Sequence, residues 1–477
     1  MSDLNNDLNQ DKNDEEIYNL IMDKTTFSRN RIKINICMVF FFMADGVEMR
    51  VFNLIIKPFG QYYDLEETSF AIQFAASSIF LGIIIGSASA SLLTKKFGRV
   101  LTINILNLIF FLCFFLRGLW MSYQVFIIFR IIIGVTIGVI IPIFLNIYGE
   151  YAPTKYRGLL LMITWSVFGV GATISSSLGL VILPELQKDK VQMYLLILTI
   201  FPFLGFISCL FLLRDSPRGL LLSKKINEST SKQTSNEVKL INLIPEQEEE
   251  QQIEEKTTTT NTNESYSTKE LIKEMFNAQY KKTTILMIFN FIFIGYNAFG
   301  IYSISSYFMD YLDEKENGKK GEERETPARD IIINQTLYAV ADIVSNVIGG
   351  FFGEIRKLGR KGGIIVTLIV SAIFTIIGLF KKILFEITSP FALGISGIYV
   401  NLMMDYVVEL YPTKIRDTST SLLFLVYRIS CFTCNFISLG FYDIHAFIPY
   451  IIFVVFSVLT FFSTWALPYE MAGKAIQ

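Results

Sequence analysis

The sequence predicts an all-α membrane protein with twelve transmembrane helices in two pseudo-symmetric six-helix bundles. Hydrophobic residues make up 52% of the 477 residues, and they gather in about twelve runs long enough to cross a bilayer. The segment EYAPTKYR at 150–157 returns as ELYPTKIR at 409–416, and KFGR at 96–99 returns as KLGR at 357–360. Because two motifs repeat in the same order, the halves are built alike, as in transporters whose substrate path runs between them.

Composition and motifs also exclude several classes of function. The net charge of -1 gives no basic surface for nucleic acid, so we expect no such partner. All five cysteines lie inside apolar runs, where a disulfide framework or a metal site lacks further ligands, so no metal and no cofactor are expected. The sequence has no phosphate-binding glycine loop and no nucleophile motif, which indicates that the protein is not an enzyme.

The polar segments divide the chain into five parts. The pattern Ser267–Glu270 is a possible capping box before apolar residues at helical spacing, and it predicts a short amphipathic helix at the end of the central polar segment. The expected order is a disordered cytosolic tail at 1–30, a six-helix bundle at 31–222, a largely disordered cytosolic linker at 223–282, a second bundle at 283–468 and a cytosolic tail at 469–477.

The short loops predict the orientation of the chain. Lysine and arginine are concentrated in the loops after the second, fourth, eighth and tenth apolar runs, whereas the loops on the other side carry more acids. Cytosolic loops carry such an excess of cations. We therefore expect a multi-pass protein of the plasma membrane or of an intracellular vesicle membrane, with the linker and both termini in the cytosol.

The repeated motifs resemble those of the major facilitator superfamily over roughly residues 30 to 470. The segment RDSPRGL at 214–220 and LPYE at 467–470 are similar to motifs of its sugar and organic-ion porters. ADGVEM at 44–49 resembles the branch related to synaptic-vesicle proteins. The resemblance implies a monomeric secondary transporter that works by alternating access. Lys95 and Arg356 depart from the family, because they stand where its loops carry aspartate.

Charged residues inside the apolar runs are the candidates for proton coupling. Asp45 and Glu48 are three residues apart on one helix face, and because two carboxylates repel each other, binding one proton relieves the repulsion. The resemblance to proton-coupled porters implies that Glu48 pairs with Arg130 and releases it when protonated. The alternative is a permanent structural ion pair in a uniporter.

Arg428 is the candidate for binding the substrate. A guanidinium in an apolar helix can hold a carboxylate through two hydrogen bonds, and organic-anion carriers of the superfamily have arginine in this region. The alternative is an ion pair between Arg428 and Asp342, which would neutralise the arginine without a substrate. Further polar or amphipathic side chains that could orient a ligand, or pack helices together, belong to Asn297, Tyr296, Asn346 and Trp165.

The resemblance also implies a cytosolic gate, in which salt bridges hold the halves together while the site opens outward. The residues expected to form it are Arg99, Glu150, Arg157, Asp215, Arg218, Arg360, Glu409 and Arg416. We therefore expect proton-coupled transport of a small carboxylate or other organic anion. The alternatives are a facilitative sugar or polyol carrier, an organic-cation carrier, and a membrane sensor that does not transport.

Overall fold

A computed structural model describes residues 29–65, 69–119, 122–151, 157–183, 188–214, 268–317, 327–352, 359–411 and 413–467, with most of their side chains. These residues form helices and no strands. The first half of the chain contains α2 (Arg29–Tyr62), α3 (Phe70–Phe97), α4 (Arg99–Gly118), α5 (Tyr123–Tyr151), α6 (Arg157–Ile182), α7 (Lys188–Leu198) and α8 (Ile200–Leu212). The second half contains α11 (Thr268–Met275), α12 (Lys281–Asn317), α13 (Pro327–Phe352), α14 (Gly359–Gly378), α15 (Lys382–Leu410), α16 (Thr413–Tyr442) and α17 (Ile448–Trp465).

The predicted helical membrane architecture is confirmed. Ten spans in the described residues are long and apolar enough to cross a membrane, and α7 and α8 together supply one of them. Two further helices, α2 with 34 residues and α12 with 37, are also long enough. Because α2 carries Asp45, Glu48 and Arg50 near its middle, it is less apolar than the others.

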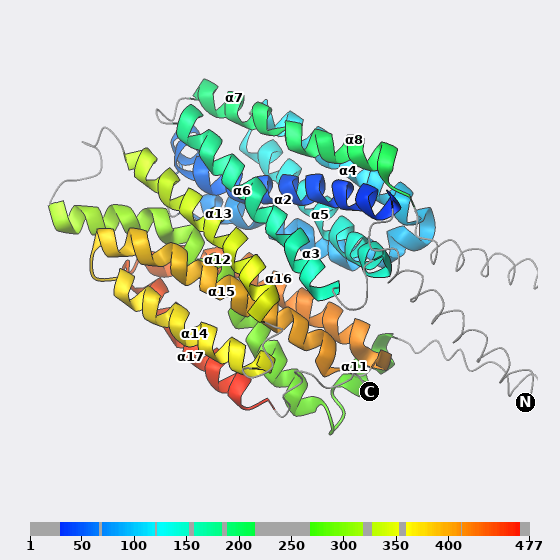
Figure 1. Cartoon of the computed structure of the whole chain (residues 1–477). Helices are drawn as coiled ribbons and strands as arrows, with labels where there is room; N and C mark the ends of the chain where they lie inside the picture. Colours follow the sequence, from blue (N-terminus) through cyan, green and yellow to red (C-terminus); the bar gives the residue numbers. More distant parts are fainter. Residues whose placement is uncertain are drawn as a thin grey trace, which may run out of the picture.

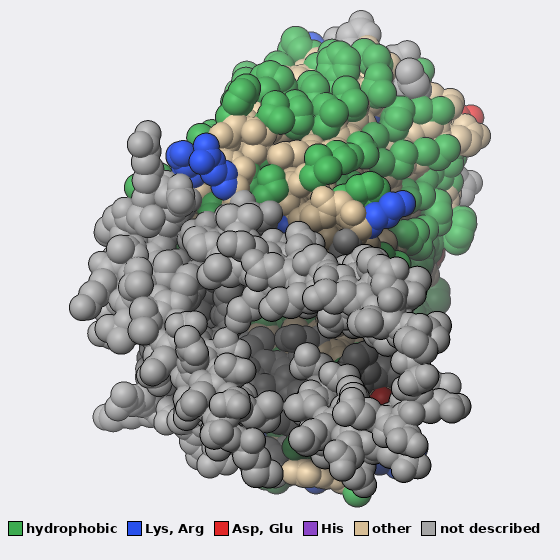
Figure 2. Space-filling model, turned by 90° about the vertical axis from the view of Figure 1, so that its right-hand side faces the viewer, with side chains coloured by type: hydrophobic (Ala, Val, Ile, Leu, Met, Phe, Trp, Pro, Cys, Tyr) green, Lys and Arg blue, Asp and Glu red, His purple; other side chains and the backbone are tan. Residues whose placement is uncertain are grey.

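The outer flanks of the helices carry exposed apolar side chains. On α4, the apolar residues Ile105, Leu108, Leu112 and Phe115 are each more than a third exposed, whereas the opposite face buries Arg117. In water such a distribution would be unfavourable, but a bilayer is as apolar as these side chains. Figure 2 shows hydrophobic side chains spread over the flank of the described helices.

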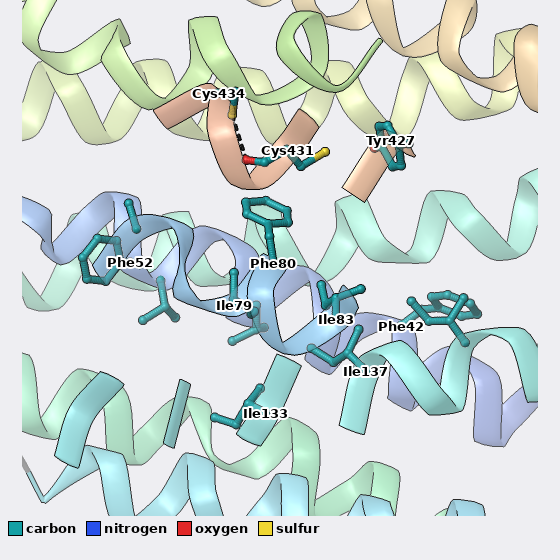
Figure 3. Packing of buried hydrophobic residues seen from close by; sticks show 14 of the residues in the cluster. Phe42, Phe52, Ile79, Phe80, Ile83, Ile133, Ile137, Tyr427, Cys431 and Cys434 are labelled. Carbon is teal, nitrogen blue, oxygen red and sulfur yellow. Dashed lines mark hydrogen bonds between the residues drawn. The ribbon is translucent and has the colours of Figure 1, made fainter. Parts of the chain in front are cut away.

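The two halves lie side by side and meet along two seams (Figure 1). One seam joins α3 to α16, and the other joins α6 to α13. At the first seam, the Asn435 side-chain amide donates a hydrogen bond to the Ser77 hydroxyl at 3.0 Å. Close by, Phe80 of α3 points toward the α16 segment that holds Cys431 and Cys434 (Figure 3). The space between the seams is where a site shared by both halves can form.

The short helix α11 lies where the capping-box pattern predicts one. Its apolar residues Leu271 and Met275 pack onto the hydrophobic core, and the helix contacts α16. The tails at 1–28 and 468–477 and the segment 215–267, which includes most of the predicted linker, lie outside the described residues.

Close packing of α2 on α6 depends on glycine. A Cβ atom added at Gly46 would overlap the backbone carbonyl of Phe168, and one added at Gly171 would overlap the carbonyl of Met43. Small residues allow two membrane helices to approach until their backbones touch. This contact holds α2, which carries three buried charges, against the rest of the first half.

We predict that Gly46→Ala lowers the thermal unfolding midpoint of the purified protein, because α2 must move away from α6 or the new methyl group must overlap a backbone atom. Overpacking of this kind costs about 1–3 kcal/mol. Gly440→Ala is the matched control, since no atom lies within 4 Å of a Cβ atom at that position. Equal midpoints for both variants would contradict the packing described here.

Candidate functional site

A central cavity of about 240 Å³ lies between the two halves. Helices α2, α5 and α6 line it from the first half, and α12, α13, α15 and α16 line it from the second. Its charged residues are Asp45, Arg50, Asp342 and Arg428, and its aromatic residues are Trp165, Phe168, Phe299, Phe424 and Tyr427. A space lined by aromatic rings and a few charges suits a small amphipathic ligand.

Glu48 is held between two arginines beside this cavity. The Nη1 atom of Arg117 on α4 donates to its Oε1 atom at 2.6 Å. The Nη1 atom of Arg130 on α5 lies 3.6 Å from the same oxygen. Glu48 is fully buried and is not among the residues that line the cavity. The sequence therefore led to one of these partners, Arg130, and missed the closer one, Arg117.

Aromatic rings complete the surroundings of the two arginines. The guanidinium of Arg117 lies 4.5 Å from the ring centre of Phe114, and that of Arg130 lies 4.3 Å from the ring centre of Phe52. Stacking on a ring stabilises a desolvated cation. Arg117 stands at the end of an apolar run, where an arginine is most simply interpreted as reaching the membrane surface. Arg117 is instead buried, because its side chain points from α4 toward the inside of the first half.

Asp45 has a different environment from Glu48, although both are on α2. Its carboxylate lines the cavity, and its Oδ1 atom is buried without a hydrogen-bond partner among the described residues. It lies within electrostatic range of Glu48 and of Arg428. The two acids therefore divide into one that is clamped behind the cavity wall and one that faces the cavity.

Arg50 and Asp342 form an ion pair that joins the halves. The Nη2 atom of Arg50 on α2 lies 3.1 Å from Oδ2 of Asp342 on α13. Arg50 also donates to the side-chain oxygen of Gln335 at 3.5 Å, and Gln335 donates in turn to the Ser305 hydroxyl on α12. The alternative that Asp342 pairs with Arg428 is therefore wrong, because Arg50 takes that position.

Arg428 faces the cavity, and no carboxylate among the described residues forms an ion pair with it. Among the residues that the structure describes, it makes no ion pair and no hydrogen bond, and its guanidinium lies 5.2 Å from the ring centre of Tyr427. Of the four arginines named here, it is the one whose charge is open to a ligand.

The remaining candidate ligand contacts divide into two groups. Trp165 and Asn346 line the cavity, and Asn346 is oriented by a hydrogen bond from Asn401 at 2.7 Å. Asn297 and Tyr296 are buried but do not line it. The Tyr296 hydroxyl donates to the carbonyl of Pro449 on α17 at 3.3 Å, so this side chain points away from the cavity into the packing of the second half. A contact between Tyr296 and a ligand is not supported by this placement.

Most of the predicted gate lies outside the described part of the structure. Arg99 begins α4, and Arg360 lies in the first turn of α14. The gate residues whose side chains are not described are Glu150, Arg157, Asp215, Arg218, Glu409 and Arg416. Their salt bridges therefore stay a prediction.

Glu48→Gln is predicted to destabilise the protein, because it leaves the charges of Arg117 and Arg130 buried side by side. Removing one partner of a buried ion pair costs about 3–5 kcal/mol. The readout is the thermal unfolding midpoint, with the exposed Glu314→Gln as the control. Adding Arg117→Met should restore part of the loss, since it removes one of the two cations. No change in midpoint for Glu48→Gln would refute the clamp.

The Arg50–Asp342 link gives a prediction about the equilibrium between conformations. The double variant Arg50→Met with Asp342→Leu removes an interaction that joins the halves, together with both of its charges. It should therefore favour states in which the halves have separated at this point. We expect a cysteine placed at Ser305 to react about tenfold faster with N-ethylmaleimide in this background.

Arg428→Met is the control for that labelling experiment, since Arg428 joins no other described residue by an ion pair. The five native cysteines are buried and contribute little background. An unchanged labelling rate in the double variant would show that the link does not hold the halves together.

Comparison with known proteins agrees with this architecture. Residues 40–476 match the family model described as sugar (and other) transporter. The putative transporter svop-1 of Caenorhabditis elegans is 21% identical over 461 residues, covering 94% of this chain and 84% of the relative. Organic cation/carnitine transporter 7 of Arabidopsis thaliana is 23% identical over 476 residues, covering 91% of this chain and 90% of the relative.

A solved structure has the same fold. The crystal structure of a D-xylose-proton symporter aligns with a TM-score of 0.69 and 16% identity, covering 93% of this chain and 99% of the other. The two pseudo-symmetric helical halves are those of the major facilitator fold. The family match covers more than half of the sequence, so the chain is a transporter and not an enzyme: it belongs to the sugar (and other) transporter family of multi-pass membrane proteins.

Proposed function

We propose that the protein transports a small organic anion, most simply a monocarboxylate, by alternating access coupled to protons. The observation that carries this proposal is the charge of the centre of the protein. We call the seven charged residues whose side chains the structure describes there the central charge cluster: Asp45, Glu48, Arg50, Arg117, Arg130, Asp342 and Arg428. Four arginines stand against three carboxylates, so the cluster has one excess positive charge when every group is ionised.

The position of Arg428, the arginine without an ion-pair partner among the described residues, supports an anionic substrate. Arg50 is paired with Asp342, and Arg117 and Arg130 are turned toward Glu48. Arg428 therefore presents its guanidinium to the cavity, where it can bind a carboxylate through two hydrogen bonds. An organic cation would have to enter a region that is already positive, at a cost that rises in a medium of low dielectric constant.

The lining of the cavity supports a compact and partly apolar substrate. Trp165, Phe299, Phe424 and Tyr427 surround the polar groups, and flat aromatic surfaces favour a ligand with a ring or short hydrocarbon part. The volume of about 240 Å³ leaves room for a small molecule of this kind. Asn346 and Asn401 add hydrogen-bonding groups that can orient it.

The proposed transport cycle assumes the membrane orientation that the charges of the loops predict. The repeated motif loops, the linker and both termini face the cytosol, and the protein acts as a monomer in the plasma membrane or a vesicle membrane. The Arg50–Asp342 link closes one side of the cavity when it forms and opens that side when it breaks. The predicted gate residues near the repeated motifs open and close the cytosolic side. Breaking one set of links while the other forms gives alternating access.

A carrier of organic cations is the second candidate. The name of the plant relative supports it, and so does Asp45, a cavity-lining carboxylate that no described residue pairs with. In that case Asp45 rather than Arg428 would bind the charge of the substrate. The two candidates therefore make opposite predictions for the same pair of variants.

We predict that purified protein in liposomes takes up radiolabelled benzoate, and that Arg428→Ala weakens benzoate binding about ten- to hundredfold by removing charge-assisted hydrogen bonds. Arg329→Ala, an exposed arginine outside the cavity, is the matched control. Tetraethylammonium and xylose are the comparison substrates. Uptake of tetraethylammonium that survives Arg428→Ala and is lost in Asp45→Asn would overturn the anion proposal, and binding without flux would indicate a sensor.

A further inference from the structure

The two acids on α2 differ in their access to a proton. Glu48 accepts a hydrogen bond from Arg117 at 2.6 Å and has Arg130 at 3.6 Å, and it does not line the cavity. Both guanidinium groups are directed at this one carboxylate, so Glu48 is held in ion pairs behind the cavity wall. Asp45 lines the cavity, and its buried Oδ1 atom has no hydrogen-bond partner among the described residues.

We propose that Asp45, and not Glu48, binds the coupled proton, and that its protonation removes a negative charge that would repel the substrate carboxylate at Arg428. This inference rests on the proposed function and names the group that couples the two fluxes. It gives Glu48 the role of a structural partner for Arg117 and Arg130. The pair expected from sequence, Glu48 with Arg130, is then structural and does not switch.

The charges that face Asp45 from each neighbouring helix support this division. On α2 itself, Glu48 lies one turn away and Arg50 is occupied by Asp342 of α13. From α16, Arg428 is the cation within electrostatic range. Arg117 of α4 and Arg130 of α5 are turned to Glu48, and α6 contributes Trp165 and Phe168, which do not ionise. Arg428 is therefore the cation that an ionised Asp45 and a bound carboxylate would share.

Sharing one cation links proton binding to anion binding. When Asp45 is ionised, a substrate carboxylate beside Arg428 meets a second negative charge in a cavity of low dielectric constant. A proton on Asp45 removes that repulsion, and by reciprocity a bound anion makes the proton bind more tightly. Anion affinity therefore rises as the pH falls through the titration of Asp45.

The balance of charge fits the co-transport of one proton with one monoanion. The proton binds a carboxylate oxygen of Asp45 on the side where the substrate enters, and it leaves from the same oxygen on the other side. The only covalent bond that forms and breaks is this O–H bond. A central charge cluster that has gained one proton and one monoanion has the same net charge as the empty cluster. Loaded and empty carriers then cross between conformations with equal buried charge.

The first arm of the test needs no substrate. Infrared difference spectra of purified protein are recorded between about pH 5 and 9, and the band of a protonated carboxyl group is followed. We expect a titrating band that disappears in Asp45→Asn and remains in Asp443→Asn, a control at an exposed aspartate outside the cavity. A band that remains in Asp45→Asn and disappears in Glu48→Gln would assign the proton to Glu48 and overturn the proposal.

The second arm measures coupling with benzoate in proteoliposomes. In the unmodified protein, benzoate affinity should rise by up to about tenfold per pH unit as the pH falls, and a proton gradient should drive accumulation. In Asp45→Asn, the affinity should lose its pH dependence, accumulation against a gradient should stop, and exchange of internal for external benzoate should continue. Persistent uphill uptake in Asp45→Asn, above that of protein-free liposomes, would overturn the proposal.

The two arms separate this inference from the proposed function. If the unmodified protein does not transport benzoate or any other anion, the proposed function fails, while the infrared titration still decides which acid binds the proton. If benzoate is transported without coupling to protons, the anion proposal stands and Asp45 is not the coupling group.

Discussion

The clamp that Arg117 and Arg130 form on Glu48 is the interaction on which the rest of the centre depends. A single charge in the middle of a bilayer costs several kcal/mol, and α2 carries three. Two arginines from α4 and α5 neutralise one acid of α2 and leave an excess of positive charge in the first half. The glycine contact between α2 and α6 then fixes α2 in the position at which both arginines reach Glu48.

The second half contributes two charged residues to the cavity, Asp342 and Arg428. Asp342 neutralises the charge of Arg50 across the interface. This ion pair offsets the cost of burying Arg50, and it joins the two halves. Arg428 comes to the same cavity from α16 without a carboxylate partner among the described residues. The site is therefore divided by function: a rigid clamp in the first half, a link between the halves, and an Asp45–Arg428 couple that a proton and an anion can change.

Much of the fold could be predicted from the sequence, because apolar run lengths and a duplicated motif are properties of the chain itself. The positions of Asp45, Glu48 and Arg428 inside membrane helices could be predicted for the same reason. Their partners depend on which way each side chain points. In the sequence, Arg117 stands at the end of an apolar run, as a cation at the membrane surface would. The structure shows that it lies on the buried face of α4 and is the closer arginine to Glu48. The pairing of Asp342 with Arg50 rather than Arg428, and the turn of Tyr296 toward α17, depend on the packing between helices that are far apart in sequence.

The effect of membrane potential on benzoate uptake, at a fixed proton gradient, tests the role of the Asp45–Arg428 couple most directly. Potassium gradients with valinomycin set the potential across proteoliposomes. Because one proton accompanies one monoanion, we expect the initial uptake rate above that of protein-free liposomes to be the same at inside-positive and inside-negative potential. Uptake driven by an inside-positive potential would mean that the anion crosses without a proton, and it would contradict the central role given to the Asp45–Arg428 couple.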